Sequence, residues 1–247
     1  MPDRHDSTLV TRFWVEQGTL LIDLGARRRI LSSAPRGGGL KRARFILNHQ
    51  VPANPIMAQV RSAKSIWYDP ARYLGRLARR IGVDHRCVAL MTAVSLDQLV
   101  TLREERDGLW VEGFFTVGVS NAVRAGEPVV SPDGGKVWLG AGTINIILVT
   151  NARLSSSAMV GAVQVATESK TAVLLAKGVP SWTKRPGATG TGTDAVVVAC
   201  GNDLTLRYSG THTPSGAMIG RLVSRGVQEG LLRSSRWNHR AAGKKPV

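Results

Sequence analysis

Cysteine and aromatic residues are scarce in this sequence of 247 residues, and each scarcity excludes a class of protein. The two cysteines, Cys87 and Cys200, lie far apart and have no second Cys or His at metal-ligand spacing. A disulfide framework and a structural zinc site are therefore not expected. Cys200 closes the apolar run 195–199, which favours a small buried thiol at a strand end over a nucleophile. Aromatic residues make up 5% of the chain, which does not indicate base-stacking platforms for nucleic acid.

Long apolar runs are also missing. The apolar stretches at residues 144–149 and 195–200 are far shorter than the roughly 20 residues that cross a bilayer. Residues 1–6 are charged, and no apolar stretch follows that would act as a secretion signal. We therefore expect no membrane insertion and a cytoplasmic location.

Acidic residues are outnumbered, since 33 Lys and Arg against 17 Asp and Glu give a formal net charge of +16. Such a charge attracts polyanions. The basic residues concentrate between residues 27 and 44 and again in the C-terminal tail, whereas the middle of the chain has few such clusters. No nucleic-acid-binding module is recognisable. A solvated basic surface is the favoured interpretation, and no specific nucleic acid is expected as a partner.

The apolar content of 43% is ample for one buried core. The predicted elements favour an α+β fold in a single domain, with a mixed, mostly antiparallel sheet and helices packed on it. Apolar residues recur at helical spacing in residues 69–81, 155–177 and 213–231. Strands are expected at residues 20–24, 30–33, 45–51, 88–94, 109–119, 143–150 and 195–199.

Two charged segments and the chain end complete this prediction. The basic residues 27–29 are expected in a turn between two strands, and residues 103–107 in a turn or a short helix end. The domain is placed at residues 9–233, and the basic residues 234–247 are expected to form a disordered tail.

Four groups of short segments stand out in order along the chain. They are residues 31–34 with 48–51, residues 91–93 with 116–122 and 125–126, residues 142–148 with 167–171, and residues 188–194 with 208–213. Each segment alone is common, but the ordered set resembles the adenosylcobinamide amidohydrolase family over most of the chain. Ser169 departs from the family pattern, which has alanine at this helical position.

The resemblance implies a reaction. Members of the family hydrolyse the amide that joins 1-aminopropan-2-ol to the corrin ring, which gives adenosylcobyric acid for coenzyme B12 synthesis. The expected partner is thus a corrinoid small molecule, which brings its own cobalt, so no cofactor and no protein-bound metal are expected. A non-catalytic corrinoid-binding protein is the alternative. Assembly into a homo-oligomer is left open.

Amide hydrolysis needs an activated nucleophile, donors for the oxyanion and an acid for the leaving amine. His212 is the first acid/base candidate, because imidazole transfers protons near neutrality and the residue directly precedes an expected helix start. The alternative is a histidine that only fixes the turn. Asp194 is suited to orient His212 or to activate water, or else it caps its own loop. Glu168 is a second candidate carboxylate, or an ordinary acidic residue near a helix start.

Substrate binding is expected from hydroxyl and amide side chains. Residues 189–193 offer peptide N–H groups and the hydroxyls of Thr189, Thr191 and Thr193, which suits an oxyanion hole or the peripheral amides of a corrin. The segment lacks the lysine and the spacing of a P-loop. Asn121 and Asn145 also suit amide recognition. Because an unpaired amide in an apolar strand is costly, Asn145 must bond either a neighbour inside the protein or a ligand.

The remaining candidates are a lysine, a second histidine and the loop threonines in a different role. Lys170 is included among the expected substrate-binding residues. His49 is a reserve candidate for proton transfer. A covalent mechanism would use a threonine hydroxyl, and an N-terminal nucleophile at Thr191 or Thr193 would require cleavage of the chain.

Overall fold

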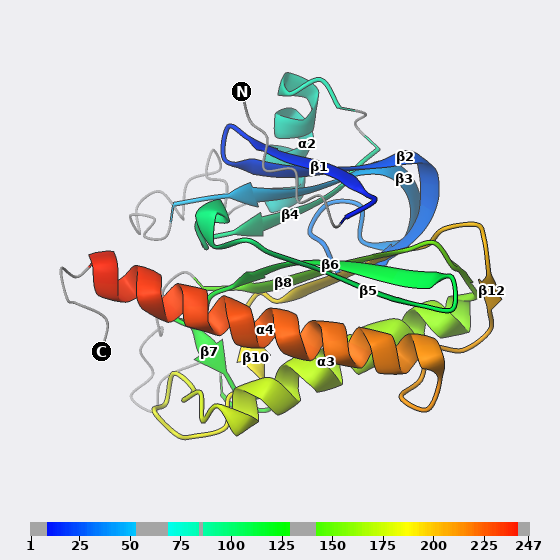
Figure 1. The fold of residues 1–247 in the computed structure, drawn as a ribbon. Helices are drawn as coiled ribbons and strands as arrows, with labels where there is room; N and C mark the ends of the chain where they lie inside the picture. Colours follow the sequence, from blue (N-terminus) through cyan, green and yellow to red (C-terminus); the bar gives the residue numbers. More distant parts are fainter. Residues whose placement is uncertain (1–8, 53–68, 84–85, 129–141, 242–247) are drawn as a thin grey trace.

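The computed structural model describes residues 9–52, 69–83, 86–128 and 142–241, with side chains up to residue 234 (Figure 1). Within these residues, eight strands form one sheet in the order β4-β3-β2-β11-β8-β6-β5, and β1 pairs with β2. The strands are β1 (Arg12–Glu16), β2 (Thr19–Ser32), β3 (Gly39–Gln50), β4 (Val88–Thr92), β5 (Val100–Arg106), β6 (Leu109–Val117), β8 (Ile144–Thr150) and β11 (Ala195–Ala199). The pairs β3–β4 and β8–β11 are parallel and the other pairs are antiparallel. The predicted α+β class with a mixed, mostly antiparallel sheet is confirmed.

The sheet folds over into two layers, with β1 to β4 in one layer and β5, β6, β8 and β11 in the other (Figure 1). The long strand β2 connects them, because it pairs with β3 along most of its length and with β11 near its end. Its register with β3 shifts between Asp23 and Arg28, and Gly25 in this irregularity has a φ of +75° that glycine adopts freely. The basic residues 27–29 therefore belong to β2, and the turn expected there is wrong.

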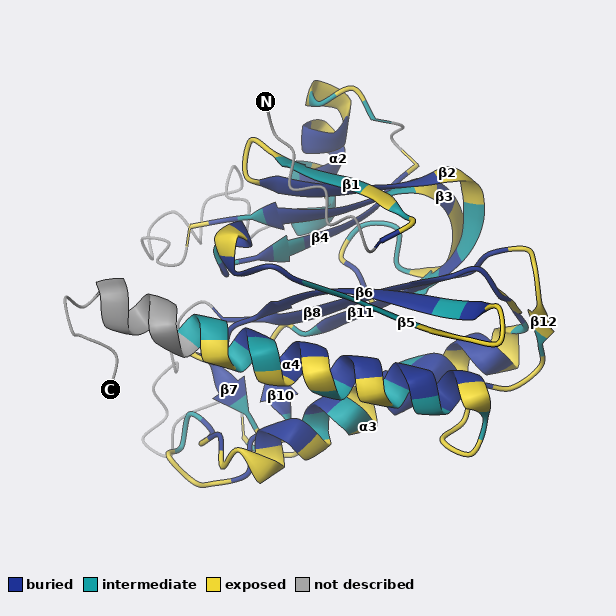
Figure 2. Cartoon of the chain, in the orientation of Figure 1, coloured by how far each residue is buried: buried dark blue, intermediate teal, exposed yellow. Residues whose placement is uncertain are grey.

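Alternation along the central strands divides the apolar side chains between two cores. On β6, Phe114 contributes to the core between the layers, and Phe115 to the core under the helices. On β8, Ile147 and Ile146 are divided in the same way, because successive side chains point to opposite faces of a sheet. Both strands are buried along nearly their whole length (Figure 2). The strand expected at residues 143–150 is therefore confirmed, and it is a central strand covered on both sides.

In the part of the chain that the structure describes, three helices cover the outer faces of the two layers. Helix α2 (Pro70–Arg80) lies on the β3–β4 layer, whereas α3 (Ser156–Ala176) and α4 (Pro214–Ala241) lie side by side on the other (Figure 1). Asp69 caps the start of α2, because its side chain accepts a hydrogen bond from the peptide N–H of Arg72 at 2.9 Å. Within the described residues, no helix is long and apolar enough to span a bilayer.

Short elements complete the ends of the sheet. They are the 3₁₀ turn η1 (Leu96–Gln98), the antiparallel pair β7 (Ala122–Val123) and β10 (Gly190–Thr191), and the parallel pair β9 (Arg153–Leu154) and β12 (Thr205–Leu206). The pair β7–β10 lies at one end of α3, and β9–β12 lies at the other (Figure 1).

Two expectations are corrected here. Residues 103–106 belong to β5, because the β5–β6 hairpin turns only at Asp107 and Gly108, which have φ values of 52° and 75°. Helix α4 continues to Ala241, so residues 234–241 are helical rather than a disordered tail. No glycine or proline interrupts this stretch. Residues 242–247 lie outside the described residues.

Candidate active site

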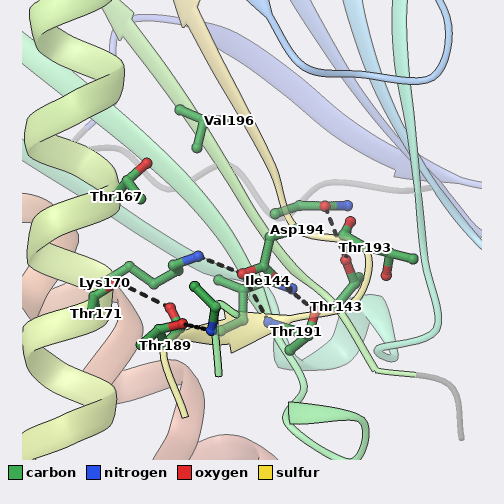
Figure 3. Close-up of polar contacts among 12 residues, drawn as sticks. Thr143, Ile144, Thr167, Lys170, Thr171, Thr189, Thr191, Thr193, Asp194 and Val196 are labelled. Atoms are coloured by element: carbon green, nitrogen blue, oxygen red, sulfur yellow. Dashed lines mark hydrogen bonds and ion pairs between the residues drawn. The ribbon is translucent and has the colours of Figure 1, made fainter. Parts of the chain in front are cut away.

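Asp194 lies in the turn that joins β10 to β11, and four donors surround its carboxylate (Figure 3). Oδ2 accepts from Lys170 Nζ at 2.5 Å and from the peptide N–H of Thr191 at 3.1 Å. Oδ1 accepts from Thr191 Oγ1 at 2.5 Å and from the peptide N–H of Ile144 at 3.0 Å. The carboxylate therefore connects α3, β10 and the start of β8 at one end of the sheet.

Lys170 reaches this carboxylate from the buried face of α3. Its side chain is 9% exposed and that of Asp194 is 14% exposed. Ala166 and Val173, one turn before and after Lys170, are buried on the same face. Two charges withdrawn this far from water persist only when they pair and make further hydrogen bonds. The sequence placed Lys170 among the site residues, and the structure brings it to Asp194.

Glu168 points away from this cluster. It is exposed and accepts a hydrogen bond from Gln164 Nε2 at 3.1 Å. Residues two apart on a helix do not share a face, so Glu168 and Lys170 point in different directions. Helix α3 is continuous through both residues, so Glu168 does not lie near a helix start.

Thr191, Asp194 and Lys170 form a continuous chain of polar groups. A hydroxyl within hydrogen-bond reach of a base, with the base oriented by a third group, is the arrangement that activates a nucleophile. The next two residues, Gly192 and Thr193, are exposed. Within the described residues their peptide N–H groups donate to no other group. Such N–H groups beside a nucleophile are suited to stabilise an oxyanion.

The other threonines fix the loop. Thr143 Oγ1 donates to the carbonyl of Thr193 at 2.9 Å, and Thr193 Oγ1 donates to the carbonyl of Gly142 at 3.2 Å. Thr189 Oγ1 accepts from the peptide N–H of Ala125 at 2.8 Å. The hydroxyl of Thr191 therefore differs from these, because its partner is a carboxylate.

Asn121 presents an unused acceptor beside the same loop. The residue is 5% exposed, and its Oδ1 atom is buried without a hydrogen-bond partner among the described residues. A Cβ atom added at Gly142 would lie 2.5 Å from this Oδ1, and one added at Gly192 would lie 4.0 Å from Nδ2. A buried acceptor left unpaired costs about 1–3 kcal/mol. The position therefore suits an amide N–H that a substrate brings.

Asn145 bonds neighbours inside the protein rather than a ligand. Its Nδ2 donates to Asn48 Oδ1 at 2.9 Å and to the carbonyl of Met91 at 2.8 Å. Asn48 Nδ2 in turn donates to Thr116 Oγ1 at 3.0 Å. These buried bonds join the two layers of the sheet, and both amide hydrogens of Asn145 are used.

His49 is enclosed at the edge of the core under α2. Its Nδ1 lies 2.8 Å from Thr19 Oγ1, and its Nε2 lies 2.9 Å from Tyr73 Oη. Burial lowers the pKa of His49, and the charge of Arg80 lowers it further. The residue lies away from Asp194, and both ring nitrogens are occupied by hydroxyl groups.

His212 lies at the opposite end of the sheet from Asp194. It is exposed in the turn before α4. The nearby Gly210 packs on Gly161 of α3, where an added Cβ would lie 3.7 Å from the Gly210 nitrogen. At about 1.5 Å per residue, Lys170 is roughly 13 Å further along α3. The expected pairing of His212 with Asp194 is therefore not formed.

Cys200 is buried at the end of β11, as its sequence context predicts. Burial raises the pKa of the Cys200 thiol, which disfavours the reactive thiolate. Among the described residues, no three His, Cys, Asp or Glu side chains gather to hold a metal ion. The expectation that the protein needs no metal of its own stays a prediction.

Sequence reasoning missed the groups that lie far from Asp194 along the chain. The peptide N–H of Ile144 and the Thr143 hydroxyl that bonds the carbonyl of Thr193 lie at the start of β8. In the sequence, this segment shows only the apolar character of a strand. The contact between Asn48 and Asn145 cannot be predicted from neighbouring residues in the sequence, because the two lie far apart along the chain. One pattern in the sequence does indicate this site. Polar residues stand just before both strands of the parallel pair, Thr143 before β8 and Asp194 before β11.

The sequence is similar to that of known proteins. Residues 3–239 match the family described as adenosylcobinamide amidohydrolase. An uncharacterized protein of Methanocaldococcus jannaschii is 34% identical over 237 residues, which cover 90% of this chain and 88% of the relative. The adenosylcobinamide amidohydrolase of Methanosarcina mazei is 32% identical over 206 residues, which cover 78% of this chain and 86% of the relative.

Among solved structures, a Burkholderia sp. beta-aminopeptidase matches with a TM-score of 0.43 and 13% sequence identity, over 90% of this chain and 79% of that chain. A likeness at this level carries no weight for function. The family match spans nearly the whole chain, confirms the resemblance seen in the sequence and favours catalysis over corrinoid binding alone. The chain therefore belongs to the adenosylcobinamide amidohydrolase family and is an enzyme that hydrolyses an amide.

Proposed function

We propose that this enzyme hydrolyses the amide between 1-aminopropan-2-ol and the corrin ring of adenosylcobinamide, which releases adenosylcobyric acid for coenzyme B12 salvage. The support for this substrate is the relative from Methanosarcina mazei that is named adenosylcobinamide amidohydrolase. The cobalt belongs to the substrate, and the steps below use only protein side chains and water.

The observation that carries the chemistry is the chain from the Thr191 hydroxyl through Asp194 to Lys170. In the proposed first step, Thr191 Oγ1 attacks the amide carbonyl while its proton passes to Asp194. The tetrahedral intermediate then collapses, the C–N bond breaks, and the proton on Asp194 passes to the leaving nitrogen. The products are free aminopropanol and an ester between Thr191 and the corrin carboxyl group.

Water completes the reaction. It attacks the ester carbonyl while Asp194 accepts a proton, and the proton then returns to Thr191 Oγ1 as the ester bond breaks. The corrin leaves as a carboxylic acid, and the three side chains regain their starting states. Lys170 stays protonated throughout and holds Asp194 by their ion pair.

Two further groups support the same reaction. The peptide N–H groups of Gly192 and Thr193 are suited to receive the oxyanion in both tetrahedral intermediates. Asn121 Oδ1 is suited to accept a hydrogen bond from an amide N–H of the substrate, which gives this buried atom a partner. Both groups lie beside Thr191, so substrate binding and bond cleavage share one site.

The reaction is tested by incubating the purified full-length protein with adenosylcobinamide and following the corrinoid and the chain by mass spectrometry. We expect loss of aminopropanol with formation of adenosylcobyric acid, and a single intact protein chain. An unchanged corrinoid, with folding confirmed by circular dichroism, would overturn the proposed reaction. A chain cleaved before Thr191 would replace the hydroxyl mechanism by an N-terminal threonine nucleophile.

A further inference from the structure

A polar cavity lies at the end of β11 opposite to Asp194. Its volume is about 250 Å³, and it is lined by Arg29, Arg42, Arg153, Cys200, Gly201 and Asn202. At about 3.3 Å per residue, Gly201 is roughly 23 Å along the chain direction from Asp194. The cavity is therefore separate from the proposed active site.

The charged residues that line this cavity are all basic. Three guanidinium groups line it, and its six lining residues, all of them described, include no carboxylate. Within the described residues, none of Arg29, Arg42 and Arg153 forms an ion pair with Asp or Glu. Like charges gathered in one small cavity repel each other, and an anion between them removes that repulsion.

Part of the cavity is already fixed. Arg29 Nη1 donates to the carbonyl of Leu154 at 3.1 Å, and its Nη2 donates to Ser156 Oγ at 3.0 Å. These bonds hold one guanidinium in place before any ligand arrives, which reduces the entropy lost on binding. Gly201 forms a wall without a side chain, because an added Cβ would lie only 1.9 Å from the carbonyl oxygen of Asn151.

We propose that Arg29, Arg42 and Arg153 form a binding site for a phosphate-class oxyanion. The planar fork of arginine matches the oxygen geometry of phosphate, and charge-assisted hydrogen bonds of this kind are stronger than neutral ones. The cavity is smaller than the roughly 300–1,000 Å³ that pockets for drug-sized ligands occupy. It accepts one phosphate group rather than a corrinoid, and that group comes either from inorganic phosphate or from a phosphate ester.

The test is calorimetric titration of the full-length protein with inorganic phosphate, and separately with adenosine 5′-monophosphate, in buffers of matched ionic strength. We expect saturable binding that Arg42→Gln and Arg153→Gln each weaken by roughly tenfold, the scale of one strong charge-assisted contact. Both side chains are exposed, so these variants keep the fold. Arg79→Gln, on the exposed side of α2, is the matched control and should bind as the wild type does.

The outcomes are distinct. Tighter binding of the nucleotide assigns the site to a phosphate ester, and equal or tighter binding of the inorganic ion assigns it to free phosphate. Absence of saturable binding to both probes overturns the proposal. It is also overturned if both pocket variants bind as the wild type does, since phosphate is then attracted only by the overall positive charge. Release of aminopropanol from adenosylcobinamide is measured in parallel, and its failure leaves this result unaffected.

Discussion

The ammonium group of Lys170 lies 2.5 Å from the carboxylate of Asp194, because helix α3 carries Lys170 to the turn that precedes β11. The pair is largely withdrawn from water, and Thr191 and Ile144 complete the hydrogen bonds of the carboxylate. One interaction therefore serves both the packing of α3 and the proposed proton transfer, so stability and turnover should respond together when it is broken.

Replacing Asp194 by Asn should lower both the free energy of unfolding and the turnover. Removal of one partner leaves the Lys170 charge buried and unpaired, which destabilises the fold by roughly 3–5 kcal/mol. Loss of the acid/base group should reduce turnover by at least roughly a hundredfold. Urea unfolding and aminopropanol release measure the two effects. Asp107→Asn is the matched control, because Asp107 is exposed in an Asp-Gly turn that Asn also forms. Wild-type stability and turnover in Asp194→Asn would refute both roles.

Replacing Asn121 by Leu should separate binding from stability. The substitution removes a buried acceptor that has no partner among the described residues, so the free energy of unfolding should stay the same or rise. The Michaelis constant for adenosylcobinamide should rise by roughly tenfold, as expected for one lost hydrogen bond to the substrate. Steady-state kinetics and urea unfolding are the measurements.

Asn145→Leu is the contrasting control for this pair. It removes an amide that bonds Asn48 and Met91, so it should lower the free energy of unfolding by roughly 1–3 kcal/mol. Equal stability losses in the two variants would show that Asn121 is structural and does not await a ligand.

The stability of the protein should fall in mild acid because of His49. Burial lowers its pKa in the folded state, whereas the unfolded chain has the ordinary value near 6.5. Below this value His49 is protonated in the unfolded chain but stays neutral in the folded chain. The free energy of unfolding therefore falls by at most about 1.4 kcal/mol per pH unit until the pH reaches the folded pKa. Urea unfolding at pH 7.5 and pH 5.5 should show a smaller loss for His49→Gln than for the wild type. Parallel losses would exclude His49 as the source.

Local patterns in the sequence predict much of the fold and part of the site. The apolar periodicity predicts β8, β11 and the three described helices, and it predicts the start of α2 near residue 69. These features depend on neighbours in the chain. The continuity of β2 and of β5 was missed because runs of charged residues resemble turns in the sequence, whereas in the structure both runs pair with neighbouring strands.

For the site, too, the sequence predicts only contacts between residues that are close along the chain. Asp194 and Thr191 are three residues apart, and their shared loop is visible in the sequence. The partner Lys170 is brought close only by the packing of α3, and the distance of His212 from the loop follows from the course of α4. A histidine before a helix start has the chemistry of a general base, but only the tertiary structure decides which end of the sheet it occupies.

Thr191 is the group on which the proposed mechanism depends, so its removal is the most direct test. We would measure aminopropanol release from adenosylcobinamide by the wild type, Thr191→Val, Thr191→Ser and His212→Ala, each with its folding verified. The mechanism predicts loss of at least roughly a hundredfold in Thr191→Val, retained activity in Thr191→Ser because the hydroxyl remains, and near-normal activity in His212→Ala. Near-normal turnover in Thr191→Val, or collapse of turnover in His212→Ala, would contradict it.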